Sequence, residues 1–178
     1  MDNKKKVLLT GAALVALSSV AVQDAQAAAN TTAIQAHAQI VAAIVVAPVA
    51  TLEFGTFSHG GVAGTVVVPP VAAPSVTGSI DHLGASNARV PGSFSMIAAL
   101  VPVVVTVGAT ATITHSTNVA ETMTINAFNI DTDAGGISEV VTNTAATNTY
   151  NIGATLNVAG TEIAGTYSGS FTVTAAYQ

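Results

Sequence analysis

The chain has no cysteine and no tryptophan, and it has very little positive charge. Without cysteine it forms no disulfide framework and no zinc–thiolate site, so its stability must come from its core. Lysine and arginine together account for only four residues: Lys4, Lys5, Lys6 and Arg89. A chain with so few cations offers no basic patch to nucleic acid or to an anionic membrane surface, which excludes both as partners.

Charge of either sign is scarce: charged residues make up 7% of the sequence, aromatic residues 4% and hydrophobic residues 50%. The surface of a soluble monomer is commonly about a quarter charged or more. Two explanations fit this composition: the surface is coated with Thr, Ser and Asn, or much of it is buried in an assembly. The abundant Val and Thr are typical of β-strands rather than of disorder.

The N-terminus has the pattern of a secretory signal peptide. Three lysines at positions 4–6 precede an apolar run over 7–22, and residues 25–27 form a small-x-small cleavage site. We predict that the signal peptide over 1–27 is removed, leaving a mature chain over 28–178. The mature chain then keeps one cation and seven acids, a net charge of −6. A retained membrane anchor is the alternative, but the run is somewhat short and is interrupted by polar residues.

Alternation of apolar and polar residues with a period of two recurs along the mature chain, and this is the repeat of a strand. Such alternation, or a short apolar run bounded by turn residues, predicts strands over 32–46, 51–57, 64–68, 75–82, 93–98, 103–107, 109–115, 121–130, 150–158 and 166–177. Turn residues separate these segments, and no long stretch has a helical period. The predicted fold is therefore all-β, an immunoglobulin-like β-sandwich that forms one domain.

The first predicted strand, over 32–46, has two readings. Gln35, His37 and Gln39 alternate with small and aliphatic residues, and a β-branched run follows before Pro48 closes the segment. A helix is the alternative, because Ala favours helices, but the period of two favours a strand.

The last predicted strand has one apolar face. The residues on this face are Tyr167, Gly169, Phe171, Val173, Ala175 and Tyr177. Ser and Thr occupy the positions between them as far as Thr174. A strand with an apolar face must pair with another surface, and the first predicted strand offers a second such face. This pairing problem is the strongest indication of function in the sequence.

The two ends of the chain resemble those of chaperone–usher pilus subunits. In such subunits a glycine lies fourteen residues from the end and a tyrosine is penultimate, and Gly165 and Tyr177 occupy those places. The Leu-Glu-Phe-Gly stretch that begins at Leu52 resembles an early Leu-x-Phe-Gly step of the same domains. The blocks 150–158 and 165–171 are similar to a secreted bacterial domain family of unknown function, which looks like a branch of the archaic chaperone–usher and spore-coat-U type subunits. Many of these pilins carry a disulfide, which this chain lacks.

The resemblance implies that the sandwich is incomplete and that the N-terminal strand of a neighbouring subunit completes it, an arrangement called donor-strand exchange. It implies an N-terminal donor-strand extension over 28–40 and a pilin-like domain over 41–178. The implied donor residues are Ile34, Ala36, Ala38 and Ile40. The implied acceptor residues are Gly165, Tyr167, Phe171, Val173 and Tyr177.

The same resemblance implies a structural function, that of a subunit polymerising head-to-tail into a pilus-like extracellular fibre. The implied partners are identical or related subunits, a periplasmic chaperone and an outer-membrane usher, and export runs through the periplasm to the cell surface. No membrane partner is expected once the signal is removed. The alternative is a self-complete, monomeric secreted or surface adhesive β-domain, in which the N-terminal strand folds back into its own sandwich.

No catalytic motif is recognisable in the sequence, and we predict neither an enzyme nor a cofactor. It contains no Gly-x-Ser-x-Gly elbow and no phosphate-binding loop. Glu53, Asp81 and Glu121 lie far apart in the sequence and belong to no recognisable motif. The histidines form no short-spaced pair, so no metal site is predicted from them: His37, His59, His82 and His115.

The segment that begins at Asp131 resembles the start of a calcium-binding loop. Asp133, Gly136 and Glu139 fall at positions three, six and nine of that template. Position twelve is Thr142, however, where the template requires a bidentate glutamate. We therefore expect a hydrophilic hairpin loop rather than a calcium site.

Overall fold

The computed structural model describes residues 32–84, 89–131, 136–142, 145 and 147–178. The chain divides into two compact units, 1–38 and 39–178. Every strand of the described residues lies in the second, which we call the main unit. The predicted signal peptide and its cleavage site lie outside the described residues. The described part of the chain contains no helix, and therefore none long and apolar enough to cross a membrane.

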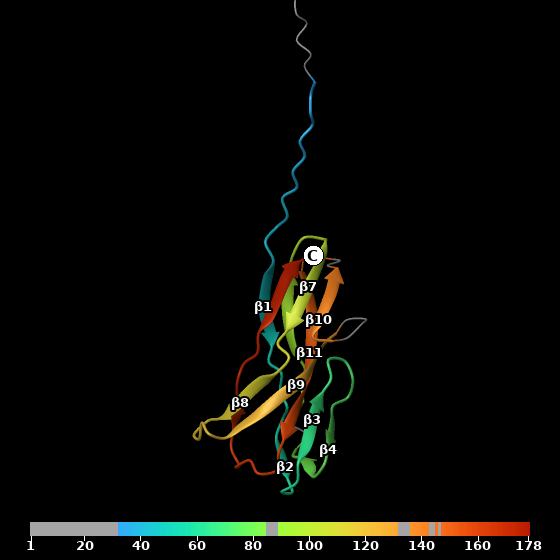
Figure 1. The fold of residues 1–178 in the computed structure, drawn as a ribbon. Coiled ribbons are helices and arrows are strands. Elements are labelled where there is room, and N and C mark those ends of the chain that lie inside the picture. Colours follow the sequence, from blue (N-terminus) through green and yellow to red (C-terminus); the bar gives the residue numbers. More distant parts are fainter. Residues whose placement is uncertain (1–31, 85–88, 132–135, 143–144, 146) are drawn as a thin grey trace, which may run out of the picture. The chain divides into compact units, whose positions relative to one another are not determined.

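The largest sheet is antiparallel and runs in the order β1-β6-β11-β9-β8-β12 (Figure 1). Its strands are β1 (Val45–Ala50), β6 (Gly92–Ile97), β8 (Ala111–His115), β9 (Thr122–Ile130), β11 (Thr147–Val158) and β12 (Tyr167–Ser168). Two further strands extend it beside the C-terminal half of β11: β3 (Gly64–Val68) and β4 (Ser75–Thr77).

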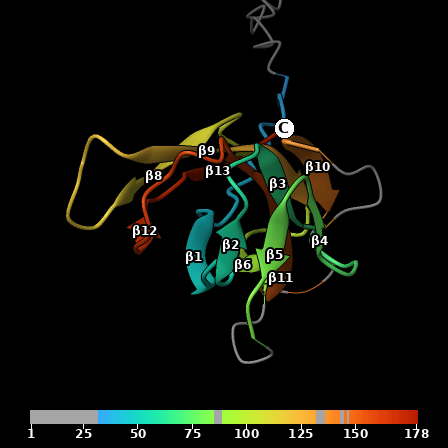
Figure 2. The same cartoon turned by 90° about the horizontal axis from the view of Figure 1, so that it is seen from below.

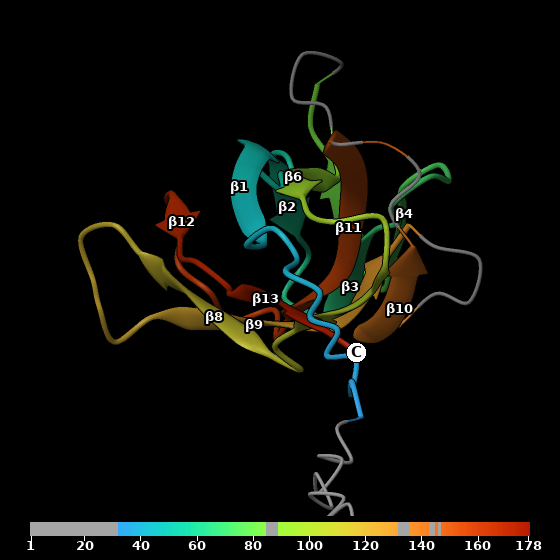
Figure 3. The same cartoon turned by 90° about the horizontal axis from the view of Figure 1, so that it is seen from above.

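A second sheet has the order β10-β7-β13, and a short strand pair forms a third. The strands of the second sheet are β7 (Pro102–Val107), β10 (Ser138–Thr142) and β13 (Val173–Tyr177). The short pair consists of β2 (Phe57–His59) and β5 (Ile80–His82). Figure 2 and Figure 3 show the main unit from its two ends, looking along the strands.

The core follows the alternation of side chains along the strands. In β7, Val103, Val105 and Val107 are buried. In β9 the phase of the alternation shifts at Ala127, whose left-handed φ of 48° falls at the bulge opposite β11. The buried residues of both sheets belong to a single apolar cluster. The predicted all-β sandwich is therefore confirmed.

Most of the predicted strands exist close to their predicted bounds. The segment 64–68 coincides with β3, and the segments 93–98, 103–107 and 121–130 differ from β6, β7 and β9 by about one residue at an end. The segment 75–82 is two strands, because the chain turns at the left-handed Gly78 and so separates β4 from β5. The strand β10 was not predicted from the sequence.

Two predictions near the N-terminus are wrong in extent. Of the segment 32–46 only the last two residues are in a strand, and β1 continues past Pro48 to Ala50. A strand needs a ladder partner, and no strand of the described residues pairs with the part before β1. The segment 51–57 contains only an isolated bridge between Glu53 and Val90 before β2 begins.

Candidate functional site: the open edges of β1 and β13

The C-terminal segment belongs to both sheets in turn. Its first part, β12, pairs with β8 in the large sheet, and its second part, β13, pairs with β7 in the small one. The prediction of one strand over 166–177 is wrong in this respect. The chain crosses between the sheets next to β8, where a side chain at Gly169 would meet the carbonyl oxygen of Thr112. The alternation survives the crossing, because Phe171 and every second residue after it up to Tyr177 are half-buried.

Strand β13 is an edge strand whose outward backbone groups can be identified. The Gly108 N–H donates to the Thr172 carbonyl, and the Gln178 N–H donates to that of Pro102. In an antiparallel ladder, hydrogen-bonded residue pairs alternate with pairs that make no hydrogen bond to each other. The even-numbered residues of β13 therefore bond to β7. The N–H and C=O groups of Val173, Ala175 and Tyr177 therefore point to the other side. No strand among the described residues pairs with that side.

Strand β1 is an edge strand of the large sheet in the same way. The Asp131 N–H donates to the Asn151 carbonyl, so Asn151 bonds to β9 and the residues next to it in β11 bond to β6. The register between β6 and β1 then determines which residues of β1 bond to β6. Val45 and Ala47 then bond to β6, whereas Val46 and Pro48 face outward. Proline lacks an N–H and fits such an outward position at no cost in ladder hydrogen bonds. The open edge of β1 explains why Pro48 lies inside the strand.

Half-buried apolar side chains accompany both open edges. They pack against the core without being covered by it, and they are Ile44 and Val46 near β1 and Phe171, Val173, Ala175 and Tyr177 near β13. An edge with unpaired backbone groups and apolar neighbours is a template for another strand. The two open edges with these side chains are called the acceptor edges below.

The other edge of the small sheet is protected. Glu139 of β10 points inward and is only 8% exposed, so it places a carboxyl group where an apolar residue is usual. Inward-pointing charges on an edge strand are one of the ways in which natural sheets prevent unwanted pairing. Only the β13 side of the small sheet therefore presents an uninterrupted apolar edge.

Tyr177 joins the C-terminal end of β13 to the chain that enters β1. Its hydroxyl accepts a hydrogen bond from the Ala99 N–H at 3.0 Å and donates one to the Ala42 carbonyl. The chain entering β1 and the chain leaving β13 therefore meet at one end of the main unit. Figure 1 shows the C-terminus at this end, near the start of β1.

The implied acceptor residues fall into two groups. Phe171, Val173 and Tyr177 lie along β13 and its approach, whereas Gly165 and Tyr167 lie beside β8. Sequence reasoning missed the edge of β1, although a proline inside a strand pattern is a signal for an edge strand.

Gly165 and Tyr167 both contact His115, which is 6% exposed. The His115 Nδ1 accepts backbone hydrogen bonds from Thr117 and Asn118 at 3.2 and 3.1 Å, so its Nε2 carries the proton and donates to the Ala164 carbonyl at 3.3 Å. The rings of His115 and Tyr167 meet edge to face at 5.0 Å. Together these contacts attach the start of the C-terminal segment to β8.

Replacing Gly165 with alanine is expected to destabilise the main unit. The new Cβ would lie on the His115 Nε2, and the imidazole cannot move without breaking its three backbone hydrogen bonds. Overpacking of this kind costs about 1–3 kcal/mol of unfolding free energy. Thermal or urea unfolding measures the loss. Gly108→Ala is the matched control, because its nearest neighbour would be at an ordinary 3.7 Å; equal stabilities of the two variants would contradict the contact with His115.

The implied donor residues lie in exposed chain without regular secondary structure. Ile34 is 88% exposed and Ile40 is 96% exposed, and Ala36 and Ala38 between them are exposed as well. These alternating apolar side chains remain in water in the subunit, so their burial against another surface would stabilise that contact. Their entry into another subunit stays a prediction.

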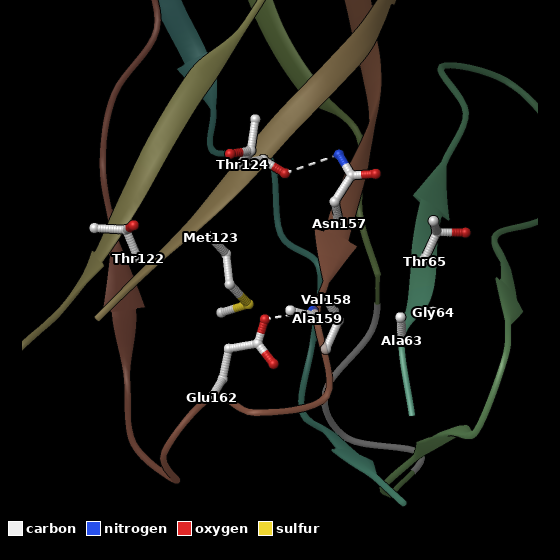
Figure 4. A pocket seen from close by; sticks show the side chains of 10 residues that line it. All are labelled: Ala63, Gly64, Thr65, Thr122, Met123, Thr124, Asn157, Val158, Ala159 and Glu162. Carbon is white, nitrogen blue, oxygen red and sulfur yellow. Dashed lines mark hydrogen bonds between the residues drawn. The ribbon is translucent and has the colours of Figure 1, made fainter. Parts of the chain in front are cut away.

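A depression of about 490 Å³ lies beside β3, β9 and the end of β11 (Figure 4). Its lining is Ala63, Gly64, Thr65, Thr122, Met123, Thr124, Asn157, Val158, Ala159 and Glu162. The one ionisable side chain, Glu162, is turned onto its own loop, where it accepts backbone hydrogen bonds from residues 159, 160 and 161. Burial raises the pKa of Glu162, but these bonds lower it by more, so the net effect is a lowered pKa. The carboxylate thus stabilises the conformation of its loop and is not a free acid–base group.

Replacing Glu162 with glutamine is expected to destabilise the main unit at neutral pH and not in acid. A lowered folded-state pKa means that the carboxylate stabilises the fold above its ordinary pKa of 4.5 and loses this effect as the pH falls through the folded value. The amide nitrogen cannot accept these bonds, so we expect a loss of about 1 kcal/mol at pH 7. Urea unfolding across the acidic range measures this. Glu53→Gln, at an exposed carboxylate, is the control; a pH-independent loss would exclude this role for the charge.

The other candidate groups are dispersed. His37 is exposed, and His59 interacts through Nε2 with the Glu162 carbonyl at 3.0 Å. No group of three or more His, Cys, Asp or Glu side chains that could hold a metal comes together in the described part of the chain. Asp133, on which the calcium-loop resemblance depends, lies outside the described residues.

A protein-family model, described as "Domain of unknown function (DUF4402)", matches residues 44–177. No curated protein matches the chain, and no solved structure does. The match begins next to β1 and ends in β13, so it includes both acceptor edges.

Proposed function

We propose a function for this chain, which belongs to the DUF4402 family of domains of unknown function, from the geometry of its open edges. It is a structural subunit of a pilus-like extracellular fibre. The N-terminal extension of one copy lies as a strand along the acceptor edges of the next copy, and repetition of this contact builds the fibre. Strand addition of this kind satisfies backbone hydrogen bonds and gives specificity through alternate side chains.

The observation that carries the proposal is that the main unit has strand edges without a partner, while the extension has alternating apolar side chains that are not buried. The acceptor edges have outward backbone groups at Val173, Ala175 and Tyr177 and half-buried apolar side chains beside them. The extension has apolar side chains at every second position, of which Ile34 and Ile40 are almost fully exposed. Burying one isoleucine stabilises a contact by about 1.5–3 kcal/mol. A strand docked with this face down would bury both.

The partners follow from the hazard of an uncovered edge. A newly exported subunit whose apolar edge is open would aggregate unless another protein covered it until assembly. A periplasmic chaperone and an outer-membrane usher are the partners we propose for this step, with identical or related subunits as the final ones. The proposed route is export through the periplasm to the cell surface. The role is structural and involves no enzymatic reaction and no cofactor.

Removal of the extension tests the proposal. Electron microscopy and analytical ultracentrifugation would compare the mature chain over 28–178 with a chain that lacks 28–39. We expect fibres from the first, and only monomers from the second, which keeps its acceptor edges and has nothing to donate. Fibres from both would show that the extension is not the linking element. A mature chain that stays monomeric and loses stability on truncation would favour the self-complete domain.

A further inference from the structure

The end of the main unit at which β1 begins and β13 finishes exposes a cluster of aliphatic side chains. Val45 and Ile97 are cross-strand partners that are 51% and 46% exposed, and Leu100 in the β6–β7 connection is 66% exposed. The hydrogen bonds of the Tyr177 hydroxyl to Ala99 and Ala42 hold this connection and the approach to β1 together. The surface formed by Val45, Ile97 and Leu100 is called the exit surface, because the N-terminal extension leaves the main unit here.

The exit surface carries no charged side chain. Three of the stretches at this end, 40–49, 95–104 and 172–178, contain no Asp, Glu, Lys or Arg. Solvent-facing surfaces of monomers usually carry mixed charges, whereas depletion of charge around apolar residues is typical of the centre of an interface. The exit surface therefore has the composition of a contact rather than of a free surface.

The length of the chain determines which molecule can cover the exit surface. If the donor residues up to Ile40 are seated in an accepting copy, only four residues lie between Ile40 and Val45 in the exit surface, a distance of five residue steps. A fully extended chain spans at most about 3.6 Å per residue, or about 18 Å in total here. The body of the accepting copy must then lie close to the exit surface. The occupant is thus a second copy of this chain.

The directions of the strands determine which end of the accepting copy is presented. Strand β13 runs toward the exit surface. A donor strand parallel to β13 would emerge at the exit surface of the accepting copy, where that copy's own extension also leaves. A donor strand antiparallel to β13 would emerge at the end of the accepting copy opposite its exit surface. Successive copies then repeat one contact between two different surfaces, as an open fibre requires.

The opposite end is defined by the long strand β11. Its residue Thr147 pairs with Ile97 of the exit surface, and its last residue, Val158, pairs with Gly64. One loop precedes Gly64 and another follows Val158. Each loop has an exposed aliphatic side chain, Val62 at 55% and Ile163 at 43%.

The two loops of this opposite end support each other. A side chain at Gly160 would meet the backbone of Val62, and the His59 Nε2 interacts with the Glu162 carbonyl at 3.0 Å. The surface formed by Val62 and Ile163 is called the entry surface. In Figure 1 these loops lie at the end of the main unit away from the C-terminus.

We infer that, in the fibre, the exit surface of each subunit packs against the entry surface of the copy that accepts its extension. This inference rests on the proposed function and adds a second contact to it. The extension links the copies, and the packing of Val45, Ile97 and Leu100 against Val62 and Ile163 fixes the angle between them. The joint between subunits is then stiff rather than a free hinge.

Engineered cysteines test the contact, because the chain has no cysteine of its own to interfere. The mature chain carrying both Leu100→Cys and Ile163→Cys would be assembled, oxidised and separated by size under denaturing, non-reducing conditions. We expect a ladder of covalent dimers, trimers and longer species. Val119→Cys with Ile163→Cys is the matched control, because Val119 is also an exposed aliphatic residue, at 82%, but lies in the β8–β9 turn outside both surfaces. The control should give no ladder.

A second variant tests the consequence for the fibre. Leu100→Asp should leave the binding of a free peptide covering residues 28–40 to the truncated main unit unchanged, and it should shorten the persistence length of the fibres severalfold on electron micrographs. Fibres without a cysteine ladder, and with unchanged stiffness in Leu100→Asp, would overturn this contact and leave donor-strand assembly standing. Failure of the peptide to bind the truncated main unit would overturn the proposed function and this inference with it.

Discussion

Replacing Ile34 with aspartate is expected to abolish fibre formation and to leave the stability of the isolated subunit unchanged. Ile34 is 88% exposed in the subunit and has no packing to lose there. In the fibre its side chain would lie on the apolar face of the acceptor edges, where an unpaired carboxylate costs several kcal/mol. Electron microscopy of the assembled chain, together with thermal unfolding of the monomer, measures the two effects separately.

Gln35→Asp is the matched control for this variant. It introduces the same charge one residue along, on the opposite face of a strand, which would point to solvent after docking. Fibres should form from it as from the unaltered chain. Equal and mild effects of the two substitutions would show that the segment does not dock with one face down.

Replacing Phe171 with aspartate is expected to damage the subunit itself as well as the fibre. The ring of Phe171 packs against that of Phe128 with centroids 4.9 Å apart, and Phe128 is buried in the core. Loss of a large aromatic side chain costs about 3–5 kcal/mol in a fully buried site and less at the half-buried Phe171, and the carboxylate adds its desolvation. A fall of this size is a large part of the total stability of a domain. Thermal and urea unfolding of the monomer measures the loss.

Thr172→Asp is the control for Phe171→Asp, because Thr172 is the next residue and is exposed. Its monomer should unfold close to the unaltered midpoint. A Phe171→Asp monomer as stable as this control would mean that the Phe171–Phe128 contact contributes nothing. The contrast between Ile34→Asp and Phe171→Asp then separates the two sides of the joint, since only the acceptor side belongs to the folded unit.

The fold was predictable from the sequence where the local pattern alone determines it. The alternation in 121–130 and the weaker one in 93–98 predict β9 and β6 nearly to the residue, and the turn residues before the β-branched run of 64–68 predict β3. The same pattern does not say which strand will be its neighbour. For this reason the pattern predicts a strand over 32–46, although no partner for most of it exists among the described residues, and one strand over 166–177, although two sheets share it.

The candidate site was predictable to a similar degree. The apolar alternation identified Phe171, Val173 and Tyr177, which do lie along the open edge of the small sheet. The reason for a glycine at 165 was hidden, because its neighbour His115 is remote in sequence and only the β8–β12 pairing brings the two together. The second open edge, at β1, depends on the registers of β6 and β11, which a single strand pattern does not contain.

The exchange of individual backbone amides in β13 tests the central claim most directly. In a main unit without residues 28–39, the amides of Thr174 and Ala176 bond to β7 and should be protected, whereas those of Val173, Ala175 and Tyr177 face the open side and should exchange rapidly. Addition of a peptide covering residues 28–40 should protect these three amides, and the fibre should show the same protection. Rapid exchange of the three amides in the presence of the peptide and in the fibre would contradict the claim that a donor strand completes this edge.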